Sequence, residues 1–254
     1  MQNLILNIFQ IEIAWENPTA NLEHLTKQIE GLSDGEIILL PETFATGFTM
    51  NIAAAQTMDG QIVQWMKKHS ANRVVCGSVF IKDDSGIFNR FIWCENGQVT
   101  YTYDKAHLFG LGGEHKLFNA GTKQITIEYK GWRIRPFVCY DLRFPVWNRN
   151  NDTIDLYLYV ANWPEVRRNA WQKLLEARAI ENQVYVAACN CVGTDGTGVQ
   201  TIGISGVIDI LGDWISQASE VEKMLRVELD GNKLIAQRKA LPFLNDRDNF
   251  EFIP

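Results

Sequence analysis

The chain has 254 residues, 46% of them hydrophobic, and no linker-like stretch or shift in composition divides it, so we expect a single domain over residues 1–254. Its formal net charge of −6 argues against a nucleic-acid partner, which would favour a basic surface. No apolar run approaches the roughly 18 residues that span a bilayer, and no signal-peptide pattern opens the chain. The cysteines lack the spacing of a disulfide framework. We therefore expect a cytoplasmic protein without a membrane segment.

Apolar strands and amphipathic helices alternate in the first half of the chain. Asn17-Pro18 predicts the start of one helix, because Asn caps helices well and Pro is favoured at the first helical position. The apolar face of this helix holds Leu22, Leu25 and Ile29, and that of a second helix holds Ile62, Val63, Trp65 and Met66. The expected strands are residues 4–11, 36–40, 74–81, 88–94 and 99–103, and the last three are joined by turns typical of hairpins.

The second half opens with a glycine-rich loop at residues 104–121, and loops of this length in compact domains are usually functional. We then expect a hairpin of residues 125–129 and 132–138, followed by a short helix at 144–150. A longer helix is expected at 169–182, and the candidates for its buried or semi-buried face include Ile180. The remaining expected strands are residues 154–160, 184–189, 202–210 and 225–229. The apolar residues of the tail, from about 239 to 254, have no obvious core of their own, so we expect this tail to dock on a neighbouring surface.

Helices between buried strands, together with antiparallel hairpins, predict an α/β sandwich with mixed sheets. Ligands of open α/β sheets bind beyond the carboxyl ends of strands. Glu42, Cys139 and Asn162-Trp163 each directly follow a buried strand. If these strands are parallel neighbours, a carboxylate, a thiol, an amide and an indole meet at one rim.

Cys139 lies where an apolar strand gives way to a charged, helix-starting segment. Cys76, Cys94 and Cys189 sit within apolar strand patterns and are expected to be buried structural thiols. At a switch from strand to helix, by contrast, the helix amino terminus can lower the pKa of a thiol and offer backbone N–H groups to an anion. Cys139 is therefore the candidate nucleophile. Cys189 and Cys191 lack the companion ligands of a zinc site, and no metal is expected.

Glu42, Lys105 and His107 are candidates to assist this thiol. Glu42 follows an apolar strand, which predicts a low-dielectric rim where desolvation raises the proton affinity that a base needs. Lys105 is either a cation that stabilises an oxyanion or a loop lysine paired with Asp104. His107 would make a Cys–His arrangement instead. The spacing of these residues does not decide whether Glu42 or His107 is the base.

Three motifs resemble, in order and approximate spacing, the nitrilase superfamily of carbon–nitrogen hydrolases: Pro41-Glu42-Thr43-Phe44 with Gly47-Phe48, Asp104-Lys105-Ala106-His107-Leu108-Phe109, and Cys139-Tyr140-Asp141-Leu142-Arg143-Phe144-Pro145. Residues 162–164 and 177–182 add two further matches, so the resemblance covers nearly the whole chain. It implies a four-layer αββα sandwich of the nitrilase type with mixed sheets, and a homodimer in which the tail takes part.

The resemblance also implies roles for single residues. Cys139 is the nucleophile, Glu42 the general base, and Lys105, with the Tyr140 backbone N–H, the stabiliser of the oxyanion. Glu114 matches the family's second active-site glutamate, which positions the lysine and the substrate. His107 then becomes a supporting residue of the loop, and the Cys–His alternative falls. No metal or organic cofactor is implied.

Within the superfamily, residues 104–109 and 159–164 look most like the bacterial ω-amidases, which hydrolyse 2-oxoglutaramate and 2-oxosuccinamate to a 2-oxo dicarboxylate and ammonia. The expected partner is thus a small-molecule amide. Phe44, Asn162 and Trp163 are expected at its pocket, and Arg167 or Arg168 as the cation for its carboxylate, although both arginines also fit a solvated helix start.

Two alternatives stay open. The first is another C–N substrate, namely deaminated glutathione, an N-carbamoyl amine or a nitrile. The second is a non-catalytic binding or assembly protein on the same fold, which loss of Glu42, Lys105 or Cys139 would favour; all three are present. Val146 stands where the superfamily frequently has Glu, a departure that lies outside the expected catalytic set.

Overall fold

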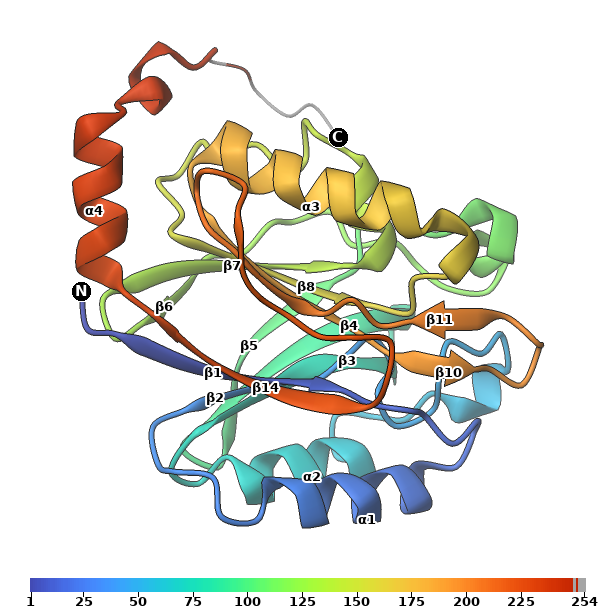
Figure 1. Ribbon diagram of the computed structural model, residues 1–254. Coiled ribbons are helices and arrows are strands. Elements are labelled where there is room, and N and C mark those ends of the chain that lie inside the picture. The colour runs from blue at the N-terminus through green and yellow to red at the C-terminus, as the bar shows by residue number, and fades with distance from the viewer. Residues whose placement is uncertain (249, 251–254) are drawn as a thin grey trace.

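The computed structural model describes residues 1–248 and 250. Two six-stranded sheets lie face to face at its centre (Figure 1). The first sheet has the order β14-β1-β2-β3-β4-β5, in which β1, β2 and β3 are parallel neighbours. Its strands are β1 (Leu4–Gln10), β2 (Ile37–Leu39), β3 (Val74–Asp83), β4 (Gly86–Glu95), β5 (Gln98–Asp104) and β14 (Lys223–Leu229).

The second sheet has the order β13-β12-β9-β8-β7-β6, in which β7, β8 and β9 are parallel neighbours. Its strands are β6 (Ile127–Tyr129), β7 (Trp132–Val138), β8 (Leu156–Ala161), β9 (Tyr185–Asn190), β12 (Gly206–Ile208) and β13 (Trp214–Gln217). A separate hairpin of β10 (Val192–Thr194) and β11 (Gln200–Ile202) lies at one end of the sandwich (Figure 1).

Helices cover the outer faces of both sheets. α1 (Pro18–Ile29) and α2 (Gln61–His69) pack on the first sheet, and α3 (Arg168–Asn182) packs on the second (Figure 1). The sequence pattern predicted an α/β sandwich with mixed sheets, and this order of layers is the αββα arrangement that the family resemblance implied. The predicted cap is also present, because the Asn17 side chain accepts a hydrogen bond from the Ala20 N–H.

Alternate residues of the inner strands enter two different cores. In β2, Ile37 and Leu39 join the core between the sheets, whereas Ile38, and Leu40 just after the strand, join the core that includes the apolar faces of α1 and α2. Successive side chains of a strand point to opposite faces, so a strand buried on both faces is apolar throughout. The short apolar runs of the sequence therefore mark the centre of the sandwich.

The helix predicted at residues 144–150 is wrong. Residues 144–150 form a turn, and the nearby helical segment is η4 (Cys139–Arg143), a 3-10 helix that precedes them and starts at the cysteine itself. The Asp141 carboxylate starts this turn by accepting the Val138 N–H at 3.0 Å. Asn148 then closes the segment, because its side chain donates to the carbonyl oxygens of Asp141 and Phe144.

Two further expectations fail in the second half. The strand predicted at residues 202–210 is broken between β11 and β12, because Gly203 and Ile204 adopt left-handed backbone conformations with φ of 68° and 55°. Ile180 is 52% exposed, since the buried stripe of α3 is formed by Trp171, Leu175 and Ala179.

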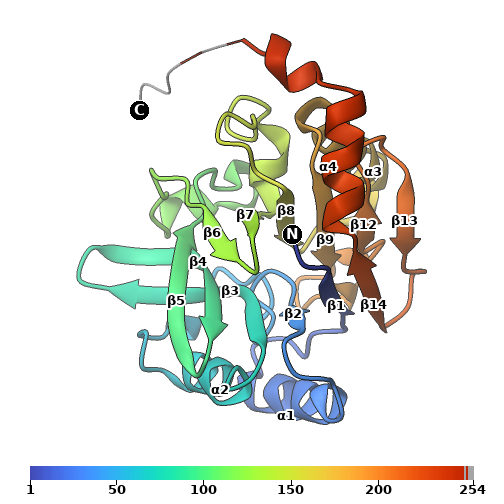
Figure 2. The ribbon, with the colours of Figure 1, turned by 90° about the vertical axis from the view of Figure 1, so that its left-hand side faces the viewer.

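The helix α4 (Gly231–Ala240) was not predicted. It begins at Asp230, whose carboxylate accepts the N–H groups of Asn232 and Lys233, and it lies beside the amino terminus (Figure 2). Arg238 fixes α4 to the second sheet by binding Asp155 at 2.7 Å. The predicted docking tail thus starts at the end of a helix, and its residues 249 and 251–254 lie outside the described part of the chain.

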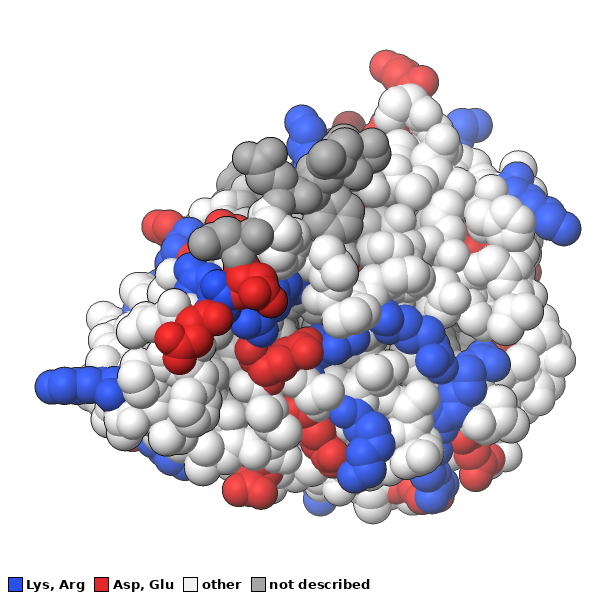
Figure 3. Space-filling view, turned by 90° about the horizontal axis from the view of Figure 1, so that it is seen from above, with Lys and Arg blue, Asp and Glu red and all other residues white. Residues whose placement is uncertain are grey.

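The described surface mixes charged and uncharged areas. On the face shown in Figure 3, acidic and basic side chains are intermixed and large areas carry neither. Of the helices in the described residues, none has the length and apolar character needed to cross a membrane.

Candidate active site

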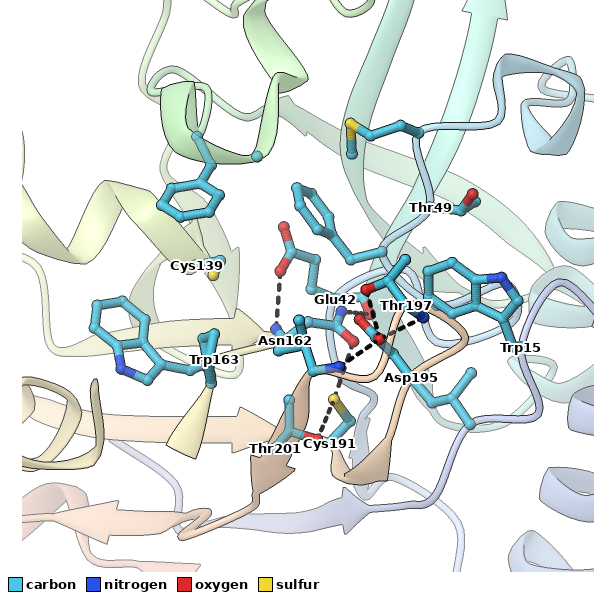
Figure 4. A pocket seen from close by; sticks show the side chains of 18 of the residues that line it. Trp15, Glu42, Thr49, Cys139, Asn162, Trp163, Cys191, Asp195, Thr197 and Thr201 are labelled. Atoms are coloured by element: carbon cyan, nitrogen blue, oxygen red, sulfur yellow. Dashed lines mark hydrogen bonds between the residues drawn. The ribbon is translucent and has the colours of Figure 1, made fainter. Parts of the chain in front are cut away.

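A cavity of about 480 Å³ opens beyond the carboxyl ends of β2, β7 and β8. Glu42, Cys139 and Asn162 line it, each just past the end of one of these strands (Figure 4). The sequence predicted this convergence along a single row of strands. β7 and β8 are indeed parallel neighbours, but β2 belongs to the facing sheet, so the residues meet across the interface between the sheets.

Cys139 sits on a sharp turn at the end of β7. Its φ of 44° lies in the left-handed region, which residues other than glycine adopt infrequently and mainly at functional or strongly held positions. The buried Asp141 carboxylate holds this turn, because it accepts the Val138 N–H and also the Tyr103 hydroxyl at 2.8 Å. The thiol therefore projects into the cavity from a fixed backbone.

Lys105 lies between two buried glutamates. Its Nζ is 2.9 Å from Glu42 Oε1 and 2.9 Å from Glu114 Oε2, and all three side chains are fully buried. Lys105 directly follows β5, and Glu114 lies in the short 3-10 helix η3 (Glu114–Lys116), where it also accepts the Phe109 N–H at 2.6 Å. The alternative in which Lys105 pairs with Asp104 is not realised, because Asp104 binds Arg90 at 2.6 Å instead.

The charges of this cluster shift the proton affinities of its members. Burial opposes the charge of Lys105, but the carboxylates of Glu114 and Glu42 outweigh it and raise the pKa of the ammonium. Burial raises the pKa of Glu114, against the effect of Lys105. Burial and then the Glu42 carboxylate raise the pKa of the Cys139 thiol well above its usual value, although Lys105 opposes this. A helix terminus can lower the pKa of a thiol, but η4 is short, and desolvation acts on the pKa of Cys139 in the opposite direction.

His107 is held away from the thiol. Its Nδ1 lies 2.8 Å from Asp141 Oδ1, and its ring stacks on Phe144 with centroids 3.6 Å apart. It does not line the cavity. The arrangement favours Glu42 over His107 as the partner of Cys139, in agreement with the resemblance.

Of the expected substrate-binding residues, Tyr140, Asn162, Trp163 and Arg167 line the cavity. Phe44 does not, so its assignment as a pocket wall is wrong: it is fully buried in the core beneath α2, where it contacts Trp65. Left-handed conformations at Thr43 and Gly47 turn the chain sharply on either side of Phe44.

The aromatic wall is supplied instead by Phe48, whose ring centroid lies 4.9 Å from Lys105 Nζ. The rim of the cavity comes from other loops. Trp15 and Trp163 lie on opposite sides of the view in Figure 4, and the turn of the β10–β11 hairpin adds Asp195 and Thr197.

Comparisons with known proteins identify the family of the chain. Residues 6–239 match the carbon-nitrogen hydrolase family. The chain belongs to this family. A relative that is 44% identical, over 98% of this chain and 99% of its own length, is the omega-amidase YafV of Escherichia coli (strain K12). The 2-oxoglutaramate amidase of Bacillus subtilis (strain 168) is 33% identical, over 95% of this chain and 96% of its own.

Among solved structures, XC1258 from Xanthomonas campestris, a CN-hydrolase superfamily protein with an arsenic adduct in its active site, superposes with a TM-score of 0.96. It is 40% identical to this carbon–nitrogen hydrolase, and the match covers 100% of both chains. The predicted superfamily is thereby confirmed.

Two functional candidates of this carbon–nitrogen hydrolase were missed by sequence reasoning. Arg143 lines the cavity with its guanidinium 4.9 Å from the Trp163 ring centroid, although only its place in the cysteine motif marked it. Asn89 of β4 donates to Glu42 Oε1 at 2.8 Å. A polar residue in the middle of an apolar strand was the signal available for Asn89.

The two arginines that the sequence offered as the cation for a substrate carboxylate lie in different surroundings. Arg167 lines the cavity, with its guanidinium carbon 5.1 Å from the Phe109 ring centroid. Arg168 binds Glu165 and Glu220 and does not line the cavity. Across residues 1–248 and 250, no three His, Cys, Asp or Glu side chains are grouped as the ligands of a metal ion would be.

Proposed function

We propose that this carbon–nitrogen hydrolase is an ω-amidase, which hydrolyses the terminal amide of 2-oxoglutaramate and 2-oxosuccinamate. The observation that carries the proposal is a fully buried Glu42–Lys105–Glu114 cluster beside Cys139, at the floor of a cavity that also holds two arginines. The names of the relatives from Escherichia coli and Bacillus subtilis support the same substrate class.

The first half of the reaction forms a thioester. Glu42 accepts the proton of the Cys139 thiol, and the sulfur attacks the terminal amide carbon. The Lys105 ammonium and the Tyr140 N–H stabilise the negative oxygen of the tetrahedral intermediate. The carbon–nitrogen bond then breaks, the protonated Glu42 returns its proton to the leaving nitrogen, and ammonia departs.

The second half restores the enzyme. Glu42 removes a proton from water, the hydroxide attacks the thioester carbon, and the 2-oxo dicarboxylate leaves as the thiol regains its proton. Glu114 holds the Lys105 ammonium together with Glu42, and these two carboxylates keep it charged and fixed in place. No redox step is involved.

Arg167 and Arg143 support a substrate that carries a carboxylate. Both guanidinium groups line the cavity, each lies against an aromatic ring, and neither forms an ion pair with a described acidic side chain. A guanidinium fits a carboxylate through two parallel hydrogen bonds. Aromatic stacking keeps each group in place while leaving its N–H edge available.

Ammonia release from a panel of substrates tests the proposal. The panel contains 2-oxoglutaramate, 2-oxosuccinamate, deaminated glutathione, an N-carbamoyl amine and a nitrile. We expect the highest kcat/KM with the two 2-oxo acid amides and no activity in Cys139→Ala. Activity on nitriles without activity on 2-oxoglutaramate would contradict the substrate class, and a Cys139→Ala variant as fast as wild type would contradict the mechanism.

The same proposal includes a cytoplasmic homodimer in which the tail takes part. Phe243, in the tail, is 62% exposed, which gives it apolar surface to bury against a partner subunit. Light scattering of the full chain is expected to give twice the mass of the 254-residue monomer. Phe243→Ser should raise the dimer dissociation constant, and a monomeric wild type would contradict the dimer.

A further inference from the structure

Asn89 touches the proposed catalytic groups from behind the cavity. Its side chain is fully buried on β4, and its Nδ2 lies 2.8 Å from Glu42 Oε1 and 3.5 Å from Glu114 Oε1. Its backbone carbonyl oxygen accepts the Lys105 N–H at 3.0 Å. Asn89 does not itself line the cavity, so it reaches all three groups without being placed to touch a substrate.

The orientation of the Asn89 amide follows from its neighbours. Ionised carboxylates only accept hydrogen bonds, so the NH₂ group and not the oxygen faces Glu42 and Glu114. The Oδ1 atom is then buried without a hydrogen-bond partner in the described part of the chain. Such a burial is unfavourable, and an apolar side chain of similar size would avoid it. Packing alone therefore does not explain an amide here.

We propose that Asn89 is a positioning residue that decides which oxygen of Glu42 accepts the proton of Cys139. This inference rests on the proposed role of Glu42 as the general base. Oε1 of Glu42 already accepts from Lys105 Nζ at 2.9 Å and from Asn89 Nδ2 at 2.8 Å, which occupies both of its lone pairs. Within the described part of the chain, the hydrogen bond that Oε2 accepts is from the Asn162 N–H, at 2.8 Å, which leaves one lone pair for the thiol proton.

Loss of the Asn89 donor has a defined consequence for catalysis. The charged groups and thiols that act on Glu42 are Lys105, Glu114, Cys139 and Cys191, and Lys105 is the cation among them. Without Asn89, Oε1 gains a free lone pair that points away from the thiol. The charged carboxylate also loses a donor that favours it over the protonated form. Activity should then disappear at a higher pH as the solution is acidified.

The test compares Asn89→Ala and Asn89→Leu with wild type in the full chain, by ammonia release from 2-oxoglutaramate. We expect kcat to fall about 10²-fold in Asn89→Ala, as for other small misplacements of a catalytic group. KM should stay within about twofold, because Asn89 does not line the cavity. The acidic limb of the kcat/KM profile should move to higher pH. Asn89→Leu keeps a similar shape but has no donor, so its kcat should fall at least as far.

Asn7→Ala is the matched control. Asn7 is a fully buried residue of β1 whose Nδ2 donates to the buried Glu36 at 2.6 Å, and its Oδ1 likewise has no partner in the described residues. This pair does not line the cavity. Asn7→Ala should therefore lower the thermal midpoint as Asn89→Ala does, while its kcat, KM and pH profile stay those of wild type.

Two outcomes would overturn the inference in different ways. If Glu42→Gln is inactive while Asn89→Leu keeps the wild-type kcat and pH profile, only the role of Asn89 fails. If Glu42→Gln hydrolyses the amide as fast as wild type, the proposed mechanism fails and the role of Asn89 fails with it. Should Asn89→Ala not fold, the Asn89→Leu variant, which keeps a similar size, decides between these outcomes.

Discussion

Asn162 donates two hydrogen bonds to Glu42, although 120 residues separate them. The backbone N–H of Asn162 binds Glu42 Oε2 at 2.8 Å, and its Nδ2 binds the Glu42 carbonyl oxygen at 2.6 Å. Asn162 follows β8 of the second sheet and Glu42 follows β2 of the first. The proposed base is therefore held in place by the sheet that carries the proposed nucleophile.

Asn162→Ala removes the side-chain half of this contact and keeps the backbone half. We expect kcat to fall about 10-fold, equivalent to about 1.4 kcal/mol, because the main chain of Glu42 is less firmly placed. Steady-state ammonia release measures this. Asn169→Ala, at an exposed position of α3, should leave kcat unchanged. Equal kcat in the Asn162→Ala variant and wild type would show that the backbone bond suffices.

Arg167→Gln should raise KM for 2-oxoglutaramate about 10- to 100-fold, since a carboxylate would lose a charged partner worth roughly 1.5–3 kcal/mol. Arg168→Gln is the control, because Arg168 binds Glu165 and Glu220 outside the cavity. KM of both variants is measured with 2-oxoglutaramate and with its uncharged methyl ester. This comparison distinguishes recognition of the carboxylate charge from recognition of the substrate's shape. A rise in KM of the same size for the ester would refute carboxylate recognition.

The pH dependence of thiol alkylation tests the electrostatics of the site. Burial and the Glu42 carboxylate raise the pKa of Cys139, so we expect its thiolate to form in alkaline solution. Alkylation of the thiol by iodoacetamide, followed by mass spectrometry, should accelerate from about pH 7 to about pH 10 without a plateau near neutrality. Cys139→Ala provides the baseline from the other thiols.

Glu42→Gln removes the negative charge that disfavours the thiolate, so the pKa of Cys139 should fall. The variant should then be alkylated faster than wild type at the same alkaline pH, even though it no longer hydrolyses amide. Slower alkylation at every pH would instead mean that Glu42 activates the thiol in the resting enzyme.

Phe44 and Phe48 should respond differently to truncation. Phe44→Ala leaves a hole in the core beside Trp65, and we expect a loss of about 3–5 kcal/mol in the free energy of unfolding. Its KM should stay near that of wild type. Phe48→Ala alters the cavity wall beside Lys105 and should change KM with a smaller loss of stability. Urea unfolding and steady-state kinetics of both variants check this contrast.

Periodicity and turn chemistry predicted most of the sandwich, because its inner strands are apolar on both faces and its hairpins carry distinctive turns. They failed where polar contacts between distant segments decide the backbone. The helix predicted after Arg143 was replaced by a turn that Asp141 and Asn148 hold, and the strand expected at 202–210 breaks where Ile204 turns left-handed. Such contacts are not visible in a single sequence.

The sequence motifs predicted which residues form the candidate site, but not the contacts between them. Glu42 and Cys139 were marked by their places at strand ends, whereas the partnership of Lys105 with Glu114 came from the family resemblance alone. The choice between Phe44 and Phe48 as the wall depends on sharp backbone turns, which no apolar pattern reveals. The sequence did not single out Asn89, because its proposed role depends on its contact with Glu42, which is 47 residues away.

The rim of the cavity has a different origin from its floor. Glu42, Lys105 and Cys139 come directly after strands of the sandwich, whereas Trp15, Thr49 and the turn of the β10–β11 hairpin are parts of loops at its edge. Loops accept substitutions and insertions more readily than packed strands. Substitutions in the rim could therefore change which amides fit the cavity while the strand-end residues of its floor stay in place.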